Sequence, residues 1–150
     1  MTIVDDLIAS PGLYVGTDRM TGTEHTGIAR IVVTVLPGGA GVTLDYEVLG
    51  GGEAKGVSHA EHAVLAKVHG DRTVLVIGHS HAETAQVLWE TEPGVFELGP
   101  EGSPFPMKVV LSMAPGGTLR HAWWYGRPGG EAEERDVSEV VRQPSPTPQP

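Results

Sequence analysis

Short stretches that alternate apolar and polar residues fill most of this chain, and clusters of glycine and proline separate them. Residues 42–48 and 107–113 show the alternation most clearly, because apolar side chains occupy every second position in both. A period of two is typical of a β-strand with one buried face. The side chains that we expect to face inward are Val42, Leu44, Tyr46, Val48, Met107, Val109, Leu111 and Met113.

The turn clusters predict that successive strands are joined by hairpins. Glycine permits the positive φ angles of tight hairpins, and proline presets the first turn position. The clusters lie at residues 37–41, 50–52, 70–71, 93–94, 99–102, 115–117 and 128–130. They delimit ten expected strands, at residues 13–20, 24–36, 41–49, 56–69, 72–80, 83–91, 95–98, 107–114, 118–126 and 132–142.

A meander of this length usually closes on itself, because closure removes the unpaired strand edges. The predicted fold class is therefore all-β, a closed antiparallel up-and-down barrel of eight to ten strands. A short helical turn over residues 4–10 precedes it. We expect a single barrel domain over residues 1–142, followed by a disordered proline-rich tail over residues 143–150, whose four prolines cannot pair in a sheet.

Composition narrows the classes of function. The net charge of −9 and the scarcity of lysine argue against nucleic-acid binding, because phosphate contacts need clustered Lys and Arg. The absence of cysteine excludes disulfides, thiolate catalysis and cysteine-based zinc sites. No apolar run is long enough for a membrane helix, and residues 1–6 lack the features of a signal peptide. We therefore expect a cytoplasmic protein that binds neither membranes nor nucleic acids.

The start of the first strand resembles a known group of barrels. The segment Gly12-Leu13-Tyr14-Val15-Gly16 is similar to the Gly-x-Trp-x-Gly start of calycin-like barrels, which include lipocalins, fatty-acid-binding proteins and nitrobindins. Tyr14 stands where those barrels have tryptophan. The resemblance spans roughly residues 11–142, and it implies a barrel whose interior holds a ligand.

Two departures from the resemblance bear on function. Only residues 21–23 separate the first two strands, where fatty-acid-binding proteins carry a two-helix lid, so a lidded lipid carrier is not expected. Nitrobindins bind haem through a histidine near the C-terminus, but the last strand here has no histidine. The resemblance also implies that a basic residue of the last strand, Arg142 or alternatively Arg135, packs across Tyr14 at one end of the barrel.

The strand over residues 118–126 carries the most informative set of polar and aromatic residues. One face holds Leu119, His121, Trp123 and Tyr125, and the other holds Thr118, Arg120, Ala122 and Trp124. We place the His121 face inward, which leaves Trp124 outside as a candidate dimer contact. If the register were the opposite, Arg120 would be the polar group inside.

An inward His121 face predicts a mostly apolar cavity with a few polar anchors, the usual composition of a small-molecule site. The expected catalytic residues, if the protein is an enzyme, are His121 and Tyr125. The expected ligand-binding residues are Tyr46, Trp89, Met107, Met113, Trp123 and Arg30. Arg30 belongs to a strand that is apolar on both faces, so either it lines the cavity or a second subunit covers its face.

Three functions are compatible with this pattern. The first is binding of an apolar small molecule in the barrel. The second is cofactor-independent catalysis by a cyclase or isomerase of a natural-product pathway, such as a polyketide pathway, which folds its substrate in the cavity. The third, from the family resemblance alone, is a nitrobindin-like haem protein. We expect a homodimer without a cofactor.

A metal site is a further hypothesis, which we do not adopt. His79 and His81 lie two residues apart and share a strand face, so both could bind one ion. Neighbouring candidates are His59, Glu61, His62 and Glu83. The favoured interpretation is that these histidines are exposed or hydrogen-bonded near the rim of the barrel.

Overall fold

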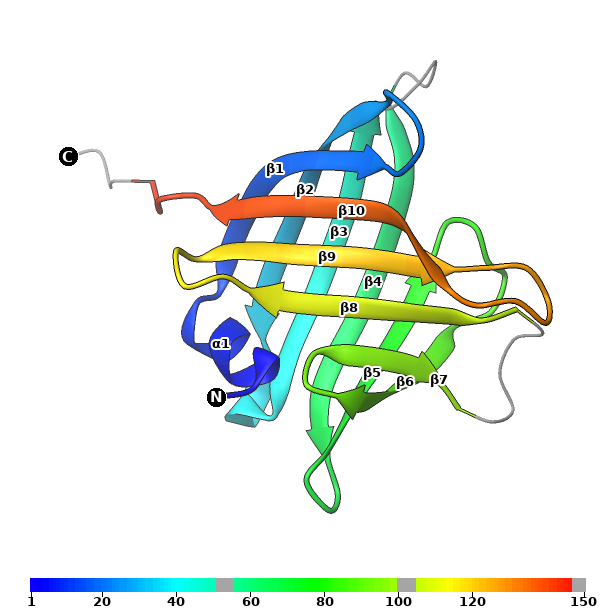
Figure 1. Ribbon diagram of the computed structural model, residues 1–150. Coiled ribbons are helices and arrows are strands. Elements are labelled where there is room, and N and C mark those ends of the chain that lie inside the picture. The colour runs from blue at the N-terminus through cyan, green and yellow to red at the C-terminus, as the bar shows by residue number, and fades with distance from the viewer. Residues whose placement is uncertain (51–55, 100–104, 147–150) are drawn as a thin grey trace.

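The computed structural model describes residues 1–50, 56–99 and 105–146, which form a closed ten-stranded antiparallel barrel (Figure 1). One short helix, α1 (Ile3–Ala9), lies at one end of the barrel. The strands are β1 (Gly12–Met20), β2 (Thr26–Val35), β3 (Gly41–Gly50), β4 (Val57–Val68), β5 (Arg72–His79), β6 (Gln86–Glu92), β7 (Val95–Leu98), β8 (Met107–Met113), β9 (Thr118–Tyr125) and β10 (Glu133–Arg142). The predicted fold class is confirmed.

Every strand pairs with its neighbours in sequence, and β1 closes the barrel by pairing with β10. Gly16 lies within this seam, opposite Val140. A Cβ atom at this position would stand 1.9 Å from the backbone oxygen of Glu139. Glycine is therefore required at the closure seam for steric reasons.

The helix α1 closes one end of the barrel. Thr2 caps it, since the Thr2 hydroxyl accepts a hydrogen bond from the Asp5 amide while the Asp5 carboxylate accepts one from the Thr2 amide. Val4 and Leu7 are fully buried against the core. At the same end the Tyr14 hydroxyl donates to the Ser10 carbonyl, at 2.7 Å.

Arg142 lies opposite Tyr14 in the β1–β10 register. Its Nε donates to the Pro11 carbonyl over 2.7 Å, which ties the last strand to the start of the first. Arg142 is thus the basic residue of the last strand that lies beside Tyr14, and its packing across the Tyr14 ring stays a prediction.

Alternation assigns the two faces of the strands as the sequence predicts. In β3 and β8 six of the expected residues are buried, namely Val42, Leu44, Tyr46, Val48, Val109 and Leu111, and Met107 and Met113 pack against them. Asp45 is exposed on the opposite face. A one-residue slip of register would exchange these faces, so the burial fixes the register.

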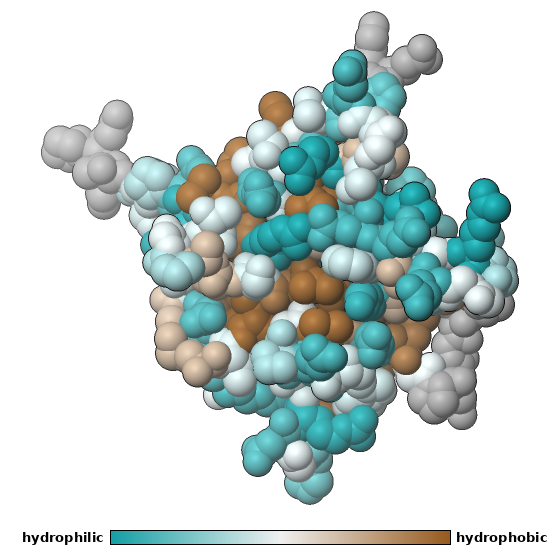
Figure 2. All heavy atoms as spheres, in the orientation of Figure 1, coloured by the Kyte–Doolittle hydropathy of each residue, from teal (hydrophilic) through white to brown (hydrophobic). Residues whose placement is uncertain are grey.

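The outer surface carries apolar side chains among polar ones, and Figure 2 shows hydrophobic atoms on the face that β8, β9 and β10 turn toward the viewer. On β2, β3 and β4 a row of exposed apolar residues, Ile28, Leu49 and Val57, runs across neighbouring strands. Trp124 is on the outer face, with the Lys108 ammonium 4.8 Å from its ring. Homodimer formation through such a surface stays a prediction.

Within the described ranges, none of the helices has the length and apolar character needed to span a membrane. Residues 143–146 form neither helix nor strand. The remainder of the predicted tail, residues 147–150, and parts of two predicted turns, residues 51–52 and 100–102, lie outside the described residues.

Candidate functional site

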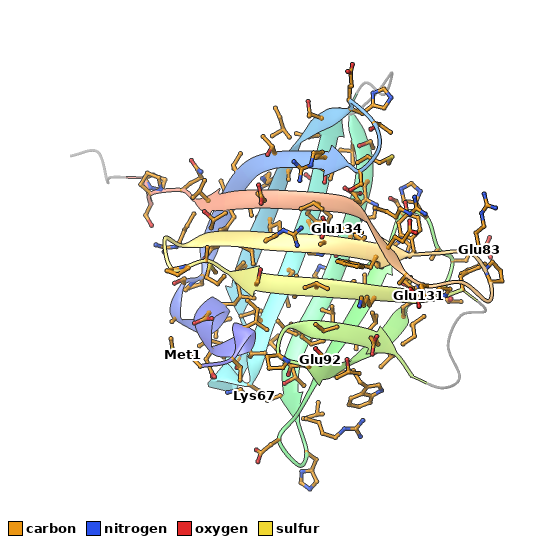
Figure 3. All side chains as sticks on the ribbon, in the orientation of Figure 1. Met1, Lys67, Glu83, Glu92, Glu131 and Glu134 are labelled. Atoms are coloured by element: carbon orange, nitrogen blue, oxygen red, sulfur yellow. The ribbon has the colours of Figure 1, made fainter. Side chains whose placement is uncertain are left out.

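A cavity of about 710 Å³ lies at the end of the barrel opposite α1. In Figure 3, Met1 and Lys67 mark the α1 end, and Glu83 and Glu131 mark the opposite end. The apolar and aromatic lining comprises Met20, Val48, Ala82, Phe105, Met107, Trp123 and Tyr125. The polar lining comprises Asp18, His25, Ser58, His59, His79, His81, Gln86 and Asp136. The cavity therefore combines aromatic walls with titratable groups.

The buried carboxylate of Glu61 forms a bridge between strands β4 and β9 inside the barrel. Glu61 lies two residues deeper along β4 than His59, and its side chain is 1 % exposed. It accepts hydrogen bonds from three ring nitrogens: His121 Nε2 at 2.9 Å, His59 Nε2 at 2.9 Å and Trp123 Nε1 at 3.1 Å. One carboxylate thus joins β4 to β9 through the barrel interior.

Glu61 is ionised in this setting. Burial raises the pKa of its carboxyl, but His121 and His59 outweigh burial and lower the pKa to about 2. Burial likewise lowers the pKa of His121, and the Glu61 carboxylate outweighs it, so that the pKa of His121 is raised. An ionised Glu61 can only accept, so both histidines donate through Nε2. The Nδ1 atom of His121 is buried with no hydrogen-bond partner among the described residues.

A second polar bridge lies beside the first. The Tyr46 hydroxyl of β3 contacts Ser138 Oγ at 2.7 Å and donates to Asp18 Oδ1 at 3.2 Å, and Ser138 Oγ also donates to Asp18, at 2.7 Å. The Tyr46 ring stacks on His121 with the ring centroids 4.7 Å apart. The two hydrogen-bonded bridges, joined by this ring stacking, form one polar layer, which we call the polar floor. It consists of Asp18, Tyr46, Glu61, His121 and Ser138, and of these Asp18 also lines the cavity.

Asp136 stands beside this floor and lines the cavity. A register shift between Glu134 and Asp136 in β10 turns Glu134 outward to Arg120, at 2.6 Å, and leaves Asp136 on the inner face. Burial raises the pKa of Asp136 to about 7, and the adjacent Asp18 carboxyl, which shares a hydrogen bond with it, adds to the rise. The Oδ1 atom of Asp136 has no partner among the described residues. A carboxyl group at the cavity therefore holds its proton close to neutral pH.

The raised pKa of Asp136 predicts how an Asp136→Asn variant behaves with pH. The pKa of Asp136 in the folded protein exceeds the ordinary value of 3.8. The stabilisation that its protonated form contributes is therefore fully present below pH 3.8 and is lost as the pH rises through about 7. Asparagine does not ionise. The melting temperature of Asp136→Asn, relative to the parent protein, should therefore rise between about pH 4 and about pH 8. Thermal unfolding followed by circular dichroism checks this, and a pH-independent difference would contradict it.

Histidine side chains gather at the rim of the cavity. The rings of His59 and His81 stack with centroids 5.2 Å apart, and His79 lies 5.9 Å from His59. His79 Nε2 is 3.2 Å from Gln86 Oε1, and burial lowers the pKa of His79. Across the described ranges no three His, Asp or Glu side chains are arranged to hold a metal ion. The rim is thus a set of stacked, hydrogen-bonded rings.

Three of the expected site residues line the cavity, and two lie in its floor. Trp123, Met107 and Tyr125 form part of its wall, with Tyr125 at the rim and 42 % exposed. Tyr46 and His121 face inward as predicted, but they belong to the polar floor and do not line the cavity.

The other three expected ligand-binding residues lie elsewhere. Met113 is on the inner face, but at the α1 end of the barrel. Arg30 is on the outer face, 3.5 Å from Glu47, because Ala29 and Ile31 fill the inner face of β2. Trp89 is also outside and packs under the Arg72 guanidinium at 3.9 Å, because Leu88 takes the inward position of β6. The predictions that Arg30, Trp89 and Met113 line the cavity were wrong.

The sequence interpretation missed both aspartates of the site. Asp136 falls in the acidic run of residues 131–136, which has the composition of a solvated edge. The alternation of Val140, Ser138 and Asp136 on one face of β10 was the available signal. Glu61 and His59 were considered only as metal ligands, whereas the structure pairs them with each other.

Comparisons with protein-family models, with curated proteins and with solved structures find no match to this chain.

Proposed function

We propose that the protein binds an apolar small molecule with a polar end group in the cavity above the polar floor. The single observation that carries the proposal is the cavity itself, of about 710 Å³, which falls within the range of ligand pockets. Aromatic and methionine side chains supply contact area for an apolar body, and methionine adapts to irregular shapes. The carboxyl groups of Asp18 and Asp136 supply polar partners for the end group.

The polar floor supports a binding role because it preorganises the site. Each floor residue is held by hydrogen bonds from at least one other strand, and Asp18 of the floor lines the cavity, so a ligand meets a carboxyl group that is already oriented. Preorganisation lowers the entropy cost of binding. The closed barrel and the Gly12–Gly16 segment also support a place for the chain among the calycin-like barrels, whose interiors bind ligands.

The test uses two tryptophan substitutions on the same strand. Gln86 lines the cavity, whereas its neighbour Val87 points outward and is 44 % exposed. Gln86→Trp should fill the cavity and weaken binding of the neutral dye N-phenyl-1-naphthylamine by about tenfold or more, corresponding to about 1.4 kcal/mol. Val87→Trp should bind the dye like the parent protein.

Dye emission during titration measures both affinities, and circular dichroism checks that both variants fold. Equal affinity of the two variants would show that the dye binds elsewhere. Absence of any dye binding by the parent protein, together with no response to other neutral apolar probes, would refute the proposed function.

A further inference from the structure

His59 has the arrangement of a positioned base. Its Nε2 donates to Glu61 at 2.9 Å, and Glu61 is itself held by His121 and Trp123. The contact with Glu61 fixes the tautomer and the ring orientation of His59, as a carboxylate does for a catalytic histidine. Nδ1 of His59 makes no hydrogen bond to a described residue, and the ring lines the cavity. Nδ1 is therefore the ring nitrogen of His59 that is left to act on a bound molecule.

Asp136 has the arrangement of a proton donor. It lines the same cavity from β10, a strand separated from the β4 strand of His59 by β1, β2 and β3. Its neighbour Asp18 accepts hydrogen bonds from Tyr46 and Ser138. Burial, together with the hydrogen bond to the Asp18 carboxyl, raises the pKa of Asp136, so Asp136 is the carboxyl of the cavity that can supply a proton. One cavity is thus lined by a base on one wall and an acid on another.

We propose that this cavity catalyses proton transfer at the carbon next to the carbonyl group of an apolar ketone, with His59 as the base and Asp136 as the acid. This activity rests on the proposed function, since the ketone must first bind in the cavity. It requires no cofactor, because enolisation neither oxidises nor reduces the substrate.

The step balances without a further reactant. His59 Nδ1 takes a proton from the α-carbon, and the electron pair of that C–H bond forms the C=C bond of the enol. The C=O π electrons move to the oxygen, which receives the proton of Asp136. The reverse step, with return of a proton to carbon, restores the ketone or places the double bond differently. Glu61 is a positioning residue, because it acts on the substrate only through His59.

The test is exchange of α-hydrogen for deuterium in 2-tetralone, a neutral apolar ketone, followed in D₂O by proton NMR. The parent protein should accelerate exchange over buffer by about 10²-fold or more, the usual size of an acid–base contribution. His59→Gln, which retains a polar side chain beside Glu61, and Asp136→Asn should each remove most of that acceleration.

A matched control lies on the outer face of the same strand. His62 contacts the Asp45 carboxylate in solvent, so it is also a histidine paired with a carboxylate, but outside the barrel. His62→Gln should leave the exchange rate unchanged. If His62→Gln slows exchange as much as His59→Gln, the reaction is catalysis by surface imidazole and the inference fails.

Displacement of N-phenyl-1-naphthylamine by 2-tetralone separates binding from catalysis. Displacement with exchange at the buffer rate would overturn the inference and leave the proposed function intact. Absence of both dye binding and 2-tetralone binding would overturn the two together. Retained binding with lost exchange in His59→Gln and Asp136→Asn is the result that supports the inference.

Discussion

Replacing Glu61 by leucine is expected to destabilise the fold by about 3–5 kcal/mol, the usual cost of removing one partner of a buried charged pair. Leucine has nearly the same size but accepts no hydrogen bond. The Nε2 atoms of His121 and His59 and the Nε1 atom of Trp123 would all lose their acceptor inside the barrel. Urea unfolding followed by circular dichroism measures the loss.

Asp45→Leu is the control for Glu61→Leu. It removes the carboxylate that faces His62 on the outer surface, where both side chains are more than half exposed. Exposed pairs contribute about 0–1 kcal/mol, so this variant should remain close to the parent protein. Equal losses in the two variants would mean that the buried bridge contributes no more than a surface contact.

The pH dependence of the Glu61→Leu effect follows from the lowered pKa of Glu61. Its stabilising contribution is present above the ordinary value of 4.5 and is lost as the pH falls toward about 2. The difference in the free energy of unfolding between the parent protein and Glu61→Leu should therefore shrink over that acidic range. A difference that stays constant would contradict the charged state of Glu61.

Gly16→Ala is expected to destabilise the barrel by about 3 kcal/mol, the upper range for an added methyl group in a packed site. The new Cβ would stand 1.9 Å from the Glu139 oxygen and 2.8 Å from the Val140 Cα. Both of these are backbone atoms, so β1 and β10 would have to separate at the seam that closes the barrel. Chemical denaturation gives the magnitude.

Gly78→Ala tests the same substitution where space is open. Gly78 also lies within a strand, β5, and a Cβ there would meet no atom within 4 Å. Alanine lowers the entropy of the unfolded chain, so this variant should be neutral or more stable by up to about 1 kcal/mol. A loss at Gly78 comparable to that at Gly16 would show that the cost of the added methyl group does not depend on the close contact at the closure seam.

The fold followed from the sequence because its two signals are local. Alternation within β3 and β8 depends on neighbouring residues alone, and glycine and proline mark turns through their own backbone angles. The same alternation placed His121 and Trp123 inside. The alternation did not place Arg30, because β2 is apolar on both faces and fits a period of two in either register. It did not place Trp89, because an aromatic residue can occupy either face of a short strand such as β6.

The site could be predicted from the sequence less completely than the fold, because its side-chain contacts join strands that are far apart along the chain. The hydrogen bond of Glu61 to His121 joins residues sixty positions apart, and that of Asp18 to Ser138 joins residues one hundred and twenty apart. Neither spacing is visible as a local pattern. The register shift that turns Asp136 inward depends on how β9 pairs with β10. The residues before Asp136 have the composition of an exposed edge, so the local sequence does not reveal this shift.

The distribution of the four methionines allows a direct test of where a ligand binds. Met20 and Met107 line the cavity, whereas Met1 and Met113 lie beside α1 at the other end of the barrel. The measurement is methyl NMR of protein labelled with ¹³C at the methionine methyl groups, during titration with N-phenyl-1-naphthylamine. A ligand in the cavity predicts shifts of the Met20 and Met107 signals, with those of Met1 and Met113 unmoved. Shifts confined to Met1 and Met113, or none during saturating titration, would contradict the assignment of the cavity as the binding site.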